Sequence, residues 1–471
     1  MINELCTKGA AELAAMIRAR EVSSAEVVDA HLSRIDEMNP TINAVTVILA
    51  DGARAAATET DRAIAAGREV GVLAGVPFTI KENIDVEGTA TTWGTAALSE
   101  QVSPSDAPVV ARLREAGAIP MARTNLPDLA FRWDTESARA GRTLNPWDDT
   151  RAVGGSSGGD AAALATGMTP LGVGNDLGGS LRVPAQMCGI TSLRPGFGRV
   201  AHSAATQPWP EPHVFQATNC QGPMARHVAD LRLALGVMAG RDVRDPRWTE
   251  GPLSGLVESS PTRVALVRDP GGLGVDPQVQ AGVDRAAAWL SDSGYDVVEA
   301  EPPNIAEVSQ LWFDAIWADI GPMWPHLEPI VGPRQVDFVA ACIAQGVLRP
   351  VDQNAQRETW MAIAAQAAAW SSFLDEFPVV LAPVCCERPW RVGDDITRVA
   401  QIAEAMRMLV SVNILGLPSC VVPVGSDEGL PQGVQLIGAR FSEERLLDAA
   451  EQIERHVPAL TPIQPRVAAL V

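Results

Sequence analysis

Hydrophobic residues in the first third of the chain follow two periods, one typical of helices and one typical of strands. Apolar positions at helical spacing predict a helix over 9–19 and a second helix that begins at Ser23 or Ser24 and runs to about Met38. Because proline cannot continue the helical hydrogen-bond ladder, Asn39-Pro40 is expected to end the second helix. Short apolar runs predict strands at 44–49, 76–80 and 119–122. Further helices are predicted at 52–66 and 107–116.

The alternation of helices and strands continues to the end of the chain. Apolar runs at 264–267 and 296–299 flank an expected helix at 277–292, which is a strand–helix–strand pattern. Nearer the C-terminus the pattern predicts two strands and two helices, at 419–424 and 433–438 and at 400–413 and 443–454. No low-complexity linker and no short-period repeat interrupts the pattern, so we expect one large α/β domain over 1–471.

Two glycine-flanked serine sites lie in the middle of the chain. The first is Gly154-Gly155-Ser156-Ser157-Gly158-Gly159 and the second is Asn175-Asp176-Leu177-Gly178-Gly179-Ser180. Glycine beside a serine permits positive φ and lets a substrate approach the backbone N–H groups, which suits a nucleophile next to a backbone anion hole. The alternative is a pair of flexible glycine–serine loops. The segment between them argues against this, because 161–166 is an ordered alanine-rich helix pattern rather than low-complexity sequence.

Lys81 ends the apolar run at 76–80. Because strand side chains alternate, Lys81 and Glu82 should face opposite ways, so Lys81 can enter the core without Glu82 as its counter-ion. A buried lysine without a paired carboxylate loses its proton more readily and can act as a base. The alternative is a lysine whose amine reaches solvent at the strand end, and this segment alone favours that alternative.

Two nucleophilic mechanisms compete for these residues. In one, Ser157 of a G-x-S-x-G motif is the nucleophile of a serine–histidine–acid hydrolase. That motif must follow a buried strand, whereas here it follows a loop-like segment at 145–151. In the other, Lys81 is the base, Ser156 relays the proton and Ser180 attacks, which uses both glycine-flanked sites.

Four segments together resemble the amidase signature family: GVPFTIKENIDVEG, NPWDDTRAVGGSSGGDAAALA, GVGNDLGGSLRVPA and SLRPGFGRV. The separations from Lys81 to Ser156 and from Ser156 to Ser180 are those expected for that family's serine–cis-serine–lysine triad. The similarity extends from about Thr7 to Glu454 and is weak over 240–400. It implies a central mixed β-sheet covered by helices on both faces, with a signature core at about 70–200 and a variable substrate wall at about 240–400.

The resemblance also implies a role for individual residues. Ser180 would attack the substrate carbonyl, Ser156 would follow a cis peptide bond and relay the proton, and Lys81 would be the final base. The oxyanion hole would consist of the backbone N–H groups of Leu177, Gly178, Gly179 and Ser180. Supporting roles fall to Ser157, Asp176 and Arg182, with Asp176 and Arg182 expected to pair and hold the nucleophile loop. No metal or cofactor is required.

Tryptophans near these motifs suggest a pocket for an apolar or aromatic group. Where many relatives read GSSTEN, this chain has Arg132-Trp133-Asp134-Thr135-Glu136-Ser137, so Trp133 would narrow or flatten the pocket. The residues expected to line it are Trp93, Leu126, Trp133, Trp209, Trp312 and Trp317. The alternative is that these tryptophans only pack loops and helices together.

Charge and cysteine content restrict the partners and the compartment. The formal net charge of −20 argues against nucleic acid and against an anionic membrane surface. No apolar run reaches the length of a membrane span, and the N-terminus does not read as a signal peptide. The seven scattered cysteines are typical of free thiols in a reducing cytoplasm, and the six histidines lack a metal-binding spacing. A cytoplasmic enzyme acting on a small molecule is expected.

The sequence therefore predicts an amidase that cleaves the C–N bond of small apolar or aromatic carboxylic amides through a seryl acyl-enzyme, with esters or carbamates as further substrates. One rival is the glutaminase subunit of a tRNA-dependent amidotransferase, against which the tryptophan-bearing loop at 131–137 and the hydrophobic region at 301–375 argue. A rival of another class is a noncatalytic binding protein on the same fold. The resemblance also allows a homodimer.

Overall fold

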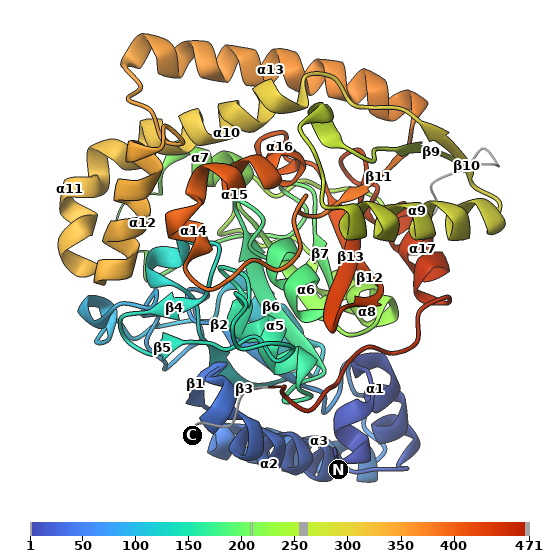
Figure 1. Ribbon diagram of the computed structural model, residues 1–471. Helices are drawn as coiled ribbons and strands as arrows, with labels where there is room; N and C mark the ends of the chain where they lie inside the picture. The colour runs from blue at the N-terminus through green and yellow to red at the C-terminus, as the bar shows by residue number, and fades with distance from the viewer. Residues whose placement is uncertain (1, 208, 210, 254–261, 467–471) are drawn as a thin grey trace.

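The computed structural model describes residues 2–207, 209, 211–253 and 262–466, and a mixed β-sheet runs through the middle of the molecule (Figure 1). Within these residues the sheet has 11 strands in the order β1-β3-β2-β6-β8-β7-β12-β13-β11-β9-β10. Parallel pairs lie towards the two ends of the sheet, where β2 pairs with β3 and β6 and where β9 pairs with β10 and β11. The strands are β1 (Val45–Ile48), β2 (Pro77–Lys81), β3 (Ile119–Thr124), β6 (Leu171–Asp176), β7 (Thr191–Arg194), β8 (Cys220–Ala225), β9 (Arg263–Leu266), β10 (Asp296–Glu299), β11 (Val379–Pro383), β12 (Ser419–Asp427) and β13 (Leu430–Ile437). A separate two-stranded hairpin consists of β4 (Glu136–Ser137) and β5 (Gly141–Arg142).

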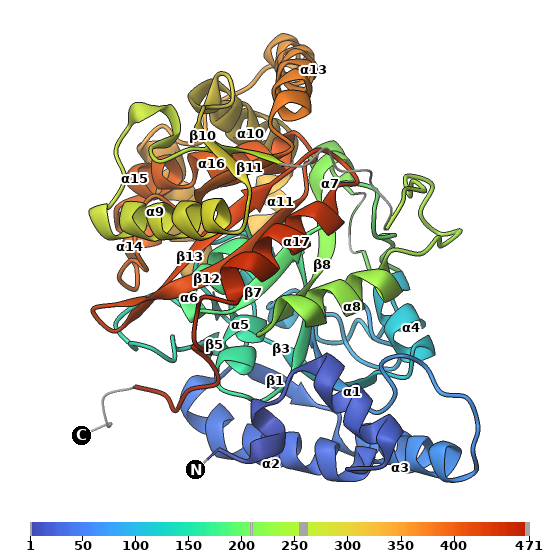
Figure 2. The ribbon, with the colours of Figure 1, turned by 90° about the vertical axis from the view of Figure 1, so that its right-hand side faces the viewer.

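Helices cover both faces of this sheet, as expected. The strand β11 shows the division, because Val379 and Leu381 pack into one hydrophobic core and Val380 and Ala382 into the other. The first core is closed by α1 (Ala10–Ala19), α4 (Pro108–Glu115), α8 (Val228–Met238), α9 (Pro277–Asp292) and α17 (Glu443–Glu454), of which α8, α9 and α17 face the viewer in Figure 2. The second core is closed mainly by α2 (Ser24–Ile42), α3 (Ala50–Ala65), α5 (Gly158–Ala165), α6 (Arg182–Cys188), α7 (His213–Thr218), α10 (Ile305–Ile320), α12 (Pro333–Ala344), α13 (Gln353–Glu376), α15 (Val399–Ala405) and α16 (Arg407–Ile414). Two short helices, α11 (Trp324–Leu327) and α14 (Asp394–Thr397), complete the set.

Two of the predicted helices differ from the structure. The helix α2 does not end at Asn39-Pro40 but continues to Ile42, with Pro40 inside its last turn. The Asn39 side chain exchanges two hydrogen bonds with the backbone of Val45, at 2.8 and 2.9 Å, and so ties this last turn to β1. The helix predicted at 400–413 is two helices, α15 and α16, which meet at Met406.

The topology brings the sequence motifs together at the C-terminal ends of two neighbouring inner strands. Since β2 and β6 are neighbouring parallel strands, their C-terminal ends at Lys81 and Asp176 emerge side by side. Helix α5, which begins at Gly158 within the first serine site, packs against both strands. No helix in the described ranges is both long and apolar enough to cross a bilayer.

Candidate active site

Lys81 lies in the interior, fully buried, and does not reach solvent at the end of β2. Phe78 and Ile80 pack into the core on the α8 and α17 face, so Lys81 points to the opposite face, towards α5. Glu82 is also buried and binds Arg139 at 2.9 Å. As expected, Lys81 enters the core without Glu82 as its counter-ion, and the solvent-reaching alternative is wrong.

The amine of Lys81 has two polar partners. Its Nζ lies 2.7 Å from Ser156 Oγ and 2.7 Å from the side-chain oxygen of Asn175. The Asn175 amide in turn donates to Asn83 Oδ1 at 3.0 Å, which fixes its orientation. Burial lowers the pKa of Lys81 to about 7, although the negative charges of Asp160 and Asp176 oppose this shift. A large fraction of Lys81 is therefore neutral near neutral pH and has a lone pair to accept a proton.

The first serine site is built on close backbone packing. The peptide bond between Gly155 and Ser156 is cis. A Cβ on Gly155 would lie 2.6 Å from the carbonyl oxygen of Arg132, so only glycine fits there. The N–H of Ser157 donates to the carbonyl oxygen of Ser180 at 3.2 Å. This bond joins the two glycine-flanked serine sites directly.

Asp176 and Arg182 hold the loop that carries Ser180. The guanidinium of Arg182 binds both carboxylate oxygens of Asp176, at 3.0 and 3.2 Å, and both side chains are fully buried. Burial alone would raise the pKa of Asp176, but the charges of Arg182 and Arg194 and a hydrogen bond from Asn413 hold it well below its usual range. The carboxylate stays ionised and also accepts the N–H of Leu181 at 3.2 Å. The pairing of Asp176 with Arg182 is confirmed.

Backbone N–H groups of the same loop surround Ser180. Gly179 has φ +97°, which an L side chain rarely adopts, and its N–H donates to Asp176 Oδ1 at 2.8 Å. Within the described residues, the N–H groups of Leu177, Gly178 and Ser180 have no protein acceptor. Three of the four N–H groups expected in the oxyanion hole are therefore free, and the fourth orients the loop instead.

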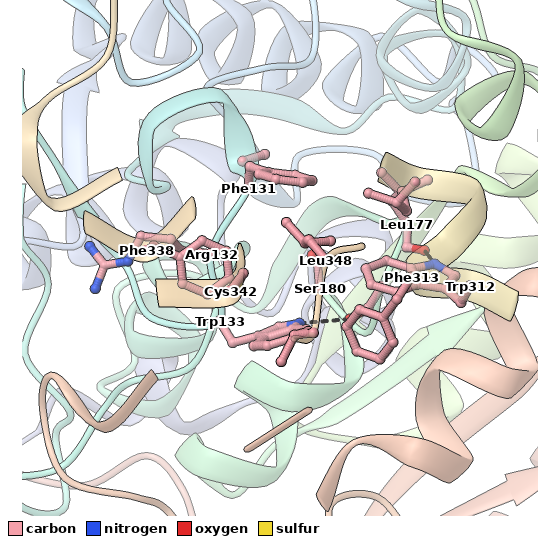
Figure 3. Close-up of a pocket in the computed structure, with 14 residues that line it drawn as sticks. Phe131, Arg132, Trp133, Leu177, Ser180, Trp312, Phe313, Phe338, Cys342 and Leu348 are labelled. Carbon is pink, nitrogen blue, oxygen red and sulfur yellow. Dashed lines mark hydrogen bonds between the residues drawn. The ribbon is translucent and has the colours of Figure 1, made fainter. Parts of the chain in front are cut away.

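An aromatic pocket opens onto Ser180 (Figure 3). Its lining is mostly apolar with a few polar groups, which is typical of small-molecule sites. Trp133 meets Phe338 and Phe313 edge to face, with ring centroids 5.7 and 6.2 Å apart, and Trp312 meets Phe313 in the same way at 4.9 Å. The guanidinium of Arg132, whose residue also lines the pocket, binds Asp395 at 3.0 Å. The pocket is thus suited to a flat apolar group next to the serine.

Comparisons with known proteins identify the family. The Amidase family matches residues 26–447. The chain belongs to the amidase family. An indoleacetamide hydrolase from Bradyrhizobium diazoefficiens is 41% identical to this amidase over 456 residues, which cover 96% of this chain and 87% of that protein. A glutamyl-tRNA(Gln) amidotransferase subunit from Acidothermus cellulolyticus is 31% identical over 490 residues, which cover 96% of this chain and 95% of the other.

The solved structures agree with the sequence relatives. A bacterial aryl acylamidase belonging to the amidase signature enzymes has a TM-score of 0.81 and 25% sequence identity to this amidase, and the match covers 98% of each chain. The amidase signature fold expected from the sequence is therefore confirmed. The protein is an enzyme that hydrolyses the C–N bond of amides.

Of the six residues expected to line the substrate pocket of this amidase, two do so. Trp133 and Trp312 line the pocket with Ser180. Trp93 and Trp209 line a small neighbouring cavity, which shares Phe131 with the first. The prolines on either side of Trp209 lie outside the described residues.

The assignments of Leu126 and Trp317 to the pocket are wrong. Trp317 follows Trp312 on α10 by five residues, which places it about 140° further around the helix, and it packs over Gly321 instead. Leu126 is fully buried beside Gly94 and lines neither cavity. Closeness in sequence to a pocket residue was therefore not sufficient, because these two side chains point away from the pocket.

Sequence reasoning missed several polar residues that surround Lys81. In the sequence Asn175 is only one position of the glycine-rich motif, yet its side chain binds the amine directly. Asp160 accepts hydroxyl hydrogen bonds from Thr79 at 2.9 Å and Thr124 at 2.7 Å, and its pKa is raised to about 6 by burial. Strand alternation could have pointed to Thr79, since it shares a face of β2 with Lys81.

The histidine-dependent alternative finds no support in the geometry. In the part of the chain that the structure describes, no histidine hydrogen-bonds to Ser156, Ser157 or Ser180. The hydroxyl of Ser157 instead faces the carbonyl of Asn175 at 3.5 Å. The same described residues contain no cluster of three or more His, Cys, Asp or Glu side chains that could hold a metal ion.

Proposed function

We propose that this amidase hydrolyses small arylacetamides through an acyl-enzyme on Ser180. The observation that carries the proposal is the aromatic pocket that opens onto Ser180, next to three backbone N–H groups that have no acceptor among the described residues. A primary amide attached through one carbon to a flat ring would place the ring among the aromatic side chains that line this pocket and its carbonyl at the N–H groups. The similarity to an indoleacetamide hydrolase supports this substrate class.

The proton path begins at the nucleophile. As Ser180 Oγ attacks the amide carbon, its proton passes to Ser156 Oγ, and the proton of Ser156 passes to the neutral amine of Lys81. Asn175 supports this direction, because its oxygen accepts an N–H of Lys81 and leaves the amine lone pair for Ser156. The N–H groups of Leu177, Gly178 and Ser180 stabilise the oxyanion.

In the second half of the proposed reaction, the proton passes to the leaving nitrogen and the carboxylic acid is released. The C–N bond breaks as the leaving nitrogen takes the proton back from Lys81 through Ser156, which yields ammonia and an acyl ester on Ser180. Water then attacks the ester while its proton passes through Ser156 to Lys81. As the bond between the acyl carbon and Ser180 Oγ breaks, this proton returns through Ser156 to Ser180, and the carboxylic acid leaves. The same acyl-enzyme chemistry extends to esters and carbamates, which have better leaving groups.

Hydrolysis of indoleacetamide and phenylacetamide tests this function directly. We expect purified enzyme to release equimolar ammonia and arylacetate from both amides, measured by chromatography and an ammonia assay. Ser180→Ala should abolish turnover, and Lys81→Met should reduce it by at least about 10³-fold, because the serine would lose its base. Turnover of glutamine with no turnover of either arylacetamide would overturn the proposal in favour of a glutaminase.

A catalytically inactive binding protein is the other alternative. The contacts of Lys81 with Ser156 and Asn175 argue against it, because a buried amine aligned with a serine is costly to keep in a protein that only binds. Absence of turnover of every amide, ester and carbamate, together with tight binding of arylacetamides, would support it.

The division of the chain is part of the same proposal. We assign the catalytic side chains to the signature core at about 70–200 and part of the substrate wall to 240–400, which contributes Trp312 and Phe313 from α10 and Phe338 from α12.

A cytoplasmic location also remains a prediction, supported by seven buried cysteines that form no disulfide. A homodimer remains a prediction that light scattering on the purified protein would test.

A further inference from the structure

Two tryptophans of the substrate pocket also hold the backbone of the nucleophile loop. The indole N–H of Trp312 donates to the carbonyl oxygen of Leu177 at 2.9 Å, and the indole N–H of Trp133 donates to the carbonyl oxygen of Gly178 at 3.1 Å. Figure 3 shows both bonds as dashed lines, with Trp133 and Trp312 reaching the loop from different elements. Both side chains are almost fully buried, at 6% and 5% exposure.

These bonds decide where the next N–H groups point. A peptide unit is planar and trans, so its C=O and the N–H of the following residue point in opposite directions. Trp312, by fixing the carbonyl of Leu177, therefore fixes the free N–H of Gly178. Trp133, by fixing the carbonyl of Gly178, fixes the N–H of Gly179, which Asp176 holds from the other side.

Close packing keeps the loop against the Trp312 ring. A Cβ on Gly178 would lie 2.4 Å from Cζ2 of Trp312, so only glycine lets the ring approach this closely. On the pocket side, both indoles lean against Phe313. Each indole is thus held on one side by aromatic rings and on the other by the loop.

We propose that Trp312 and Trp133 are positioning residues for the oxyanion hole: through their indole N–H groups they hold the Leu177–Gly178–Gly179 peptides in the orientation that stabilises the transition state. This inference rests on the proposed function, because the same loop carries the proposed nucleophile. Their aromatic faces bind the substrate, and their N–H groups act on the rate.

Removing only the N–H separates these two roles. Trp312→Phe keeps an aromatic ring, and substitution of Trp312 by benzothienylalanine keeps the bicyclic shape but replaces the N–H with sulfur. We expect each change to lower kcat for phenylacetamide by about 10- to 100-fold, because an oxyanion donor is misdirected, with KM changed by less than about threefold. Trp133→Phe should act in the same direction but less strongly, since Asp176 still holds Gly179.

Trp317→Phe is the matched control, because Trp317 lies on the same helix but does not line the pocket. It should leave both kcat and KM unchanged. The contrary result for Trp312 would be an unchanged kcat with a raised KM in the benzothienylalanine enzyme, which would show that the indole is only a wall of the pocket.

Ligand binding provides a readout that does not depend on turnover and that misfolding would not mimic. A phenyl trifluoromethyl ketone, which forms a tetrahedral adduct with the serine, should lose affinity in Trp312→Phe in parallel with kcat, whereas phenylacetate should bind as it does to the wild-type enzyme. Equal losses for both ligands would overturn the inference. Failure of the wild-type enzyme to turn over phenylacetamide would instead overturn the proposed function.

Discussion

Burial sets the chemistry of Lys81 at the scale of the single residue. The amine is fully buried on the α5 face of β2, and the resulting desolvation brings its pKa to about 7. Asp160 and Asp176 raise the same pKa by their charge but do not cancel the effect of burial. Because the proposed mechanism uses the neutral amine, the pH dependence of the reaction should report on Lys81.

The first prediction concerns the pH profile. Protonated Lys81 cannot accept the proton of Ser156, so kcat/KM for an arylacetamide should rise as the pH rises through about 7. Asp160→Asn removes a negative charge that favours protonated Lys81, so the midpoint of this rise should move to lower pH. Asn keeps a side-chain oxygen for one of the two threonine hydroxyls. A midpoint that stays fixed or moves upward would contradict this account of Lys81.

The second prediction concerns stability. The folded pKa of Lys81 is lowered to about 7 from a reference of 10.5, so the unfolded chain binds more protons between these values, and the wild-type protein loses stability as pH falls from about 10.5 to about 7. The Lys81→Met variant has no ionisable group at this position, so its unfolding free energy does not contain this pH-dependent loss. The free energy of unfolding of Lys81→Met minus that of the wild type should therefore increase as pH falls from 10 to 7, measured by denaturant titration. A difference that does not change with pH would mean that Lys81 is not desolvated in the folded state.

At the scale of elements, two glycines differ sharply in how closely other atoms pack around them. Gly155 packs directly on the backbone of the 132–134 segment, whereas Gly236 lies exposed on α8 with no heavy atom within 4 Å of an added Cβ. The two positions form a natural pair for one substitution.

Alanine at these two glycines should have opposite effects. Gly155→Ala forces backbone atoms apart, so we expect a loss of about 1–3 kcal/mol in unfolding free energy and a loss of activity. Gly236→Ala should stabilise the protein by about 0.5–1 kcal/mol and leave activity unchanged, because alanine is the better helix former. Thermal unfolding and phenylacetamide turnover measure both effects. Equal effects of the two substitutions would show that the packing around Gly155 is not tight.

Most elements of the fold could be predicted from hydrophobic periodicity. The closing helix has the predicted bounds, and the strand–helix–strand unit appears as β9, α9 and β10 with parallel strands. Periodicity failed where a local signal was overridden by a tertiary contact. Pro40 ends no helix because Asn39 ties the last turn of α2 to β1, and the short strand β8 (CQGPMA) was missed because glycine and proline conceal its pattern.

At the scale of the whole molecule, the substrate pocket joins segments that lie far apart in the sequence. The proposed catalytic residues lie in short local motifs, so the sequence could predict that Lys81 and the two serine sites lie close together. The pocket is completed by Phe338 on α12 and Phe313 on α10, whose placement depends on how α12 packs against α14 and α15 and how α10 packs against α13 and α16. Local sequence carries no signal for these contacts, which is why only two of the expected tryptophans line the pocket.

The composition of this pocket predicts substrate selectivity. Glutamine would place an ammonium and a carboxylate in a cavity whose described lining has a single charged residue, Arg132, already paired with Asp395. We expect kcat/KM for phenylacetamide to exceed that for glutamine by at least about 100-fold, because desolvated charges without partners are costly. Competition between the two substrates, followed by product analysis, measures the ratio. A ratio near one would contradict the assignment of the aromatic pocket.

The most direct test of the central claim is covalent labelling of the nucleophile. After exposure to a small fluorophosphonate, intact mass and peptide mapping should show one adduct, on Ser180. The adduct should be absent in Ser180→Ala and should form much more slowly in Lys81→Ala, because the proton relay would lack its base. An adduct on Ser157, or a rate of labelling at Ser180 that does not depend on Lys81, would contradict the serine–serine–lysine mechanism.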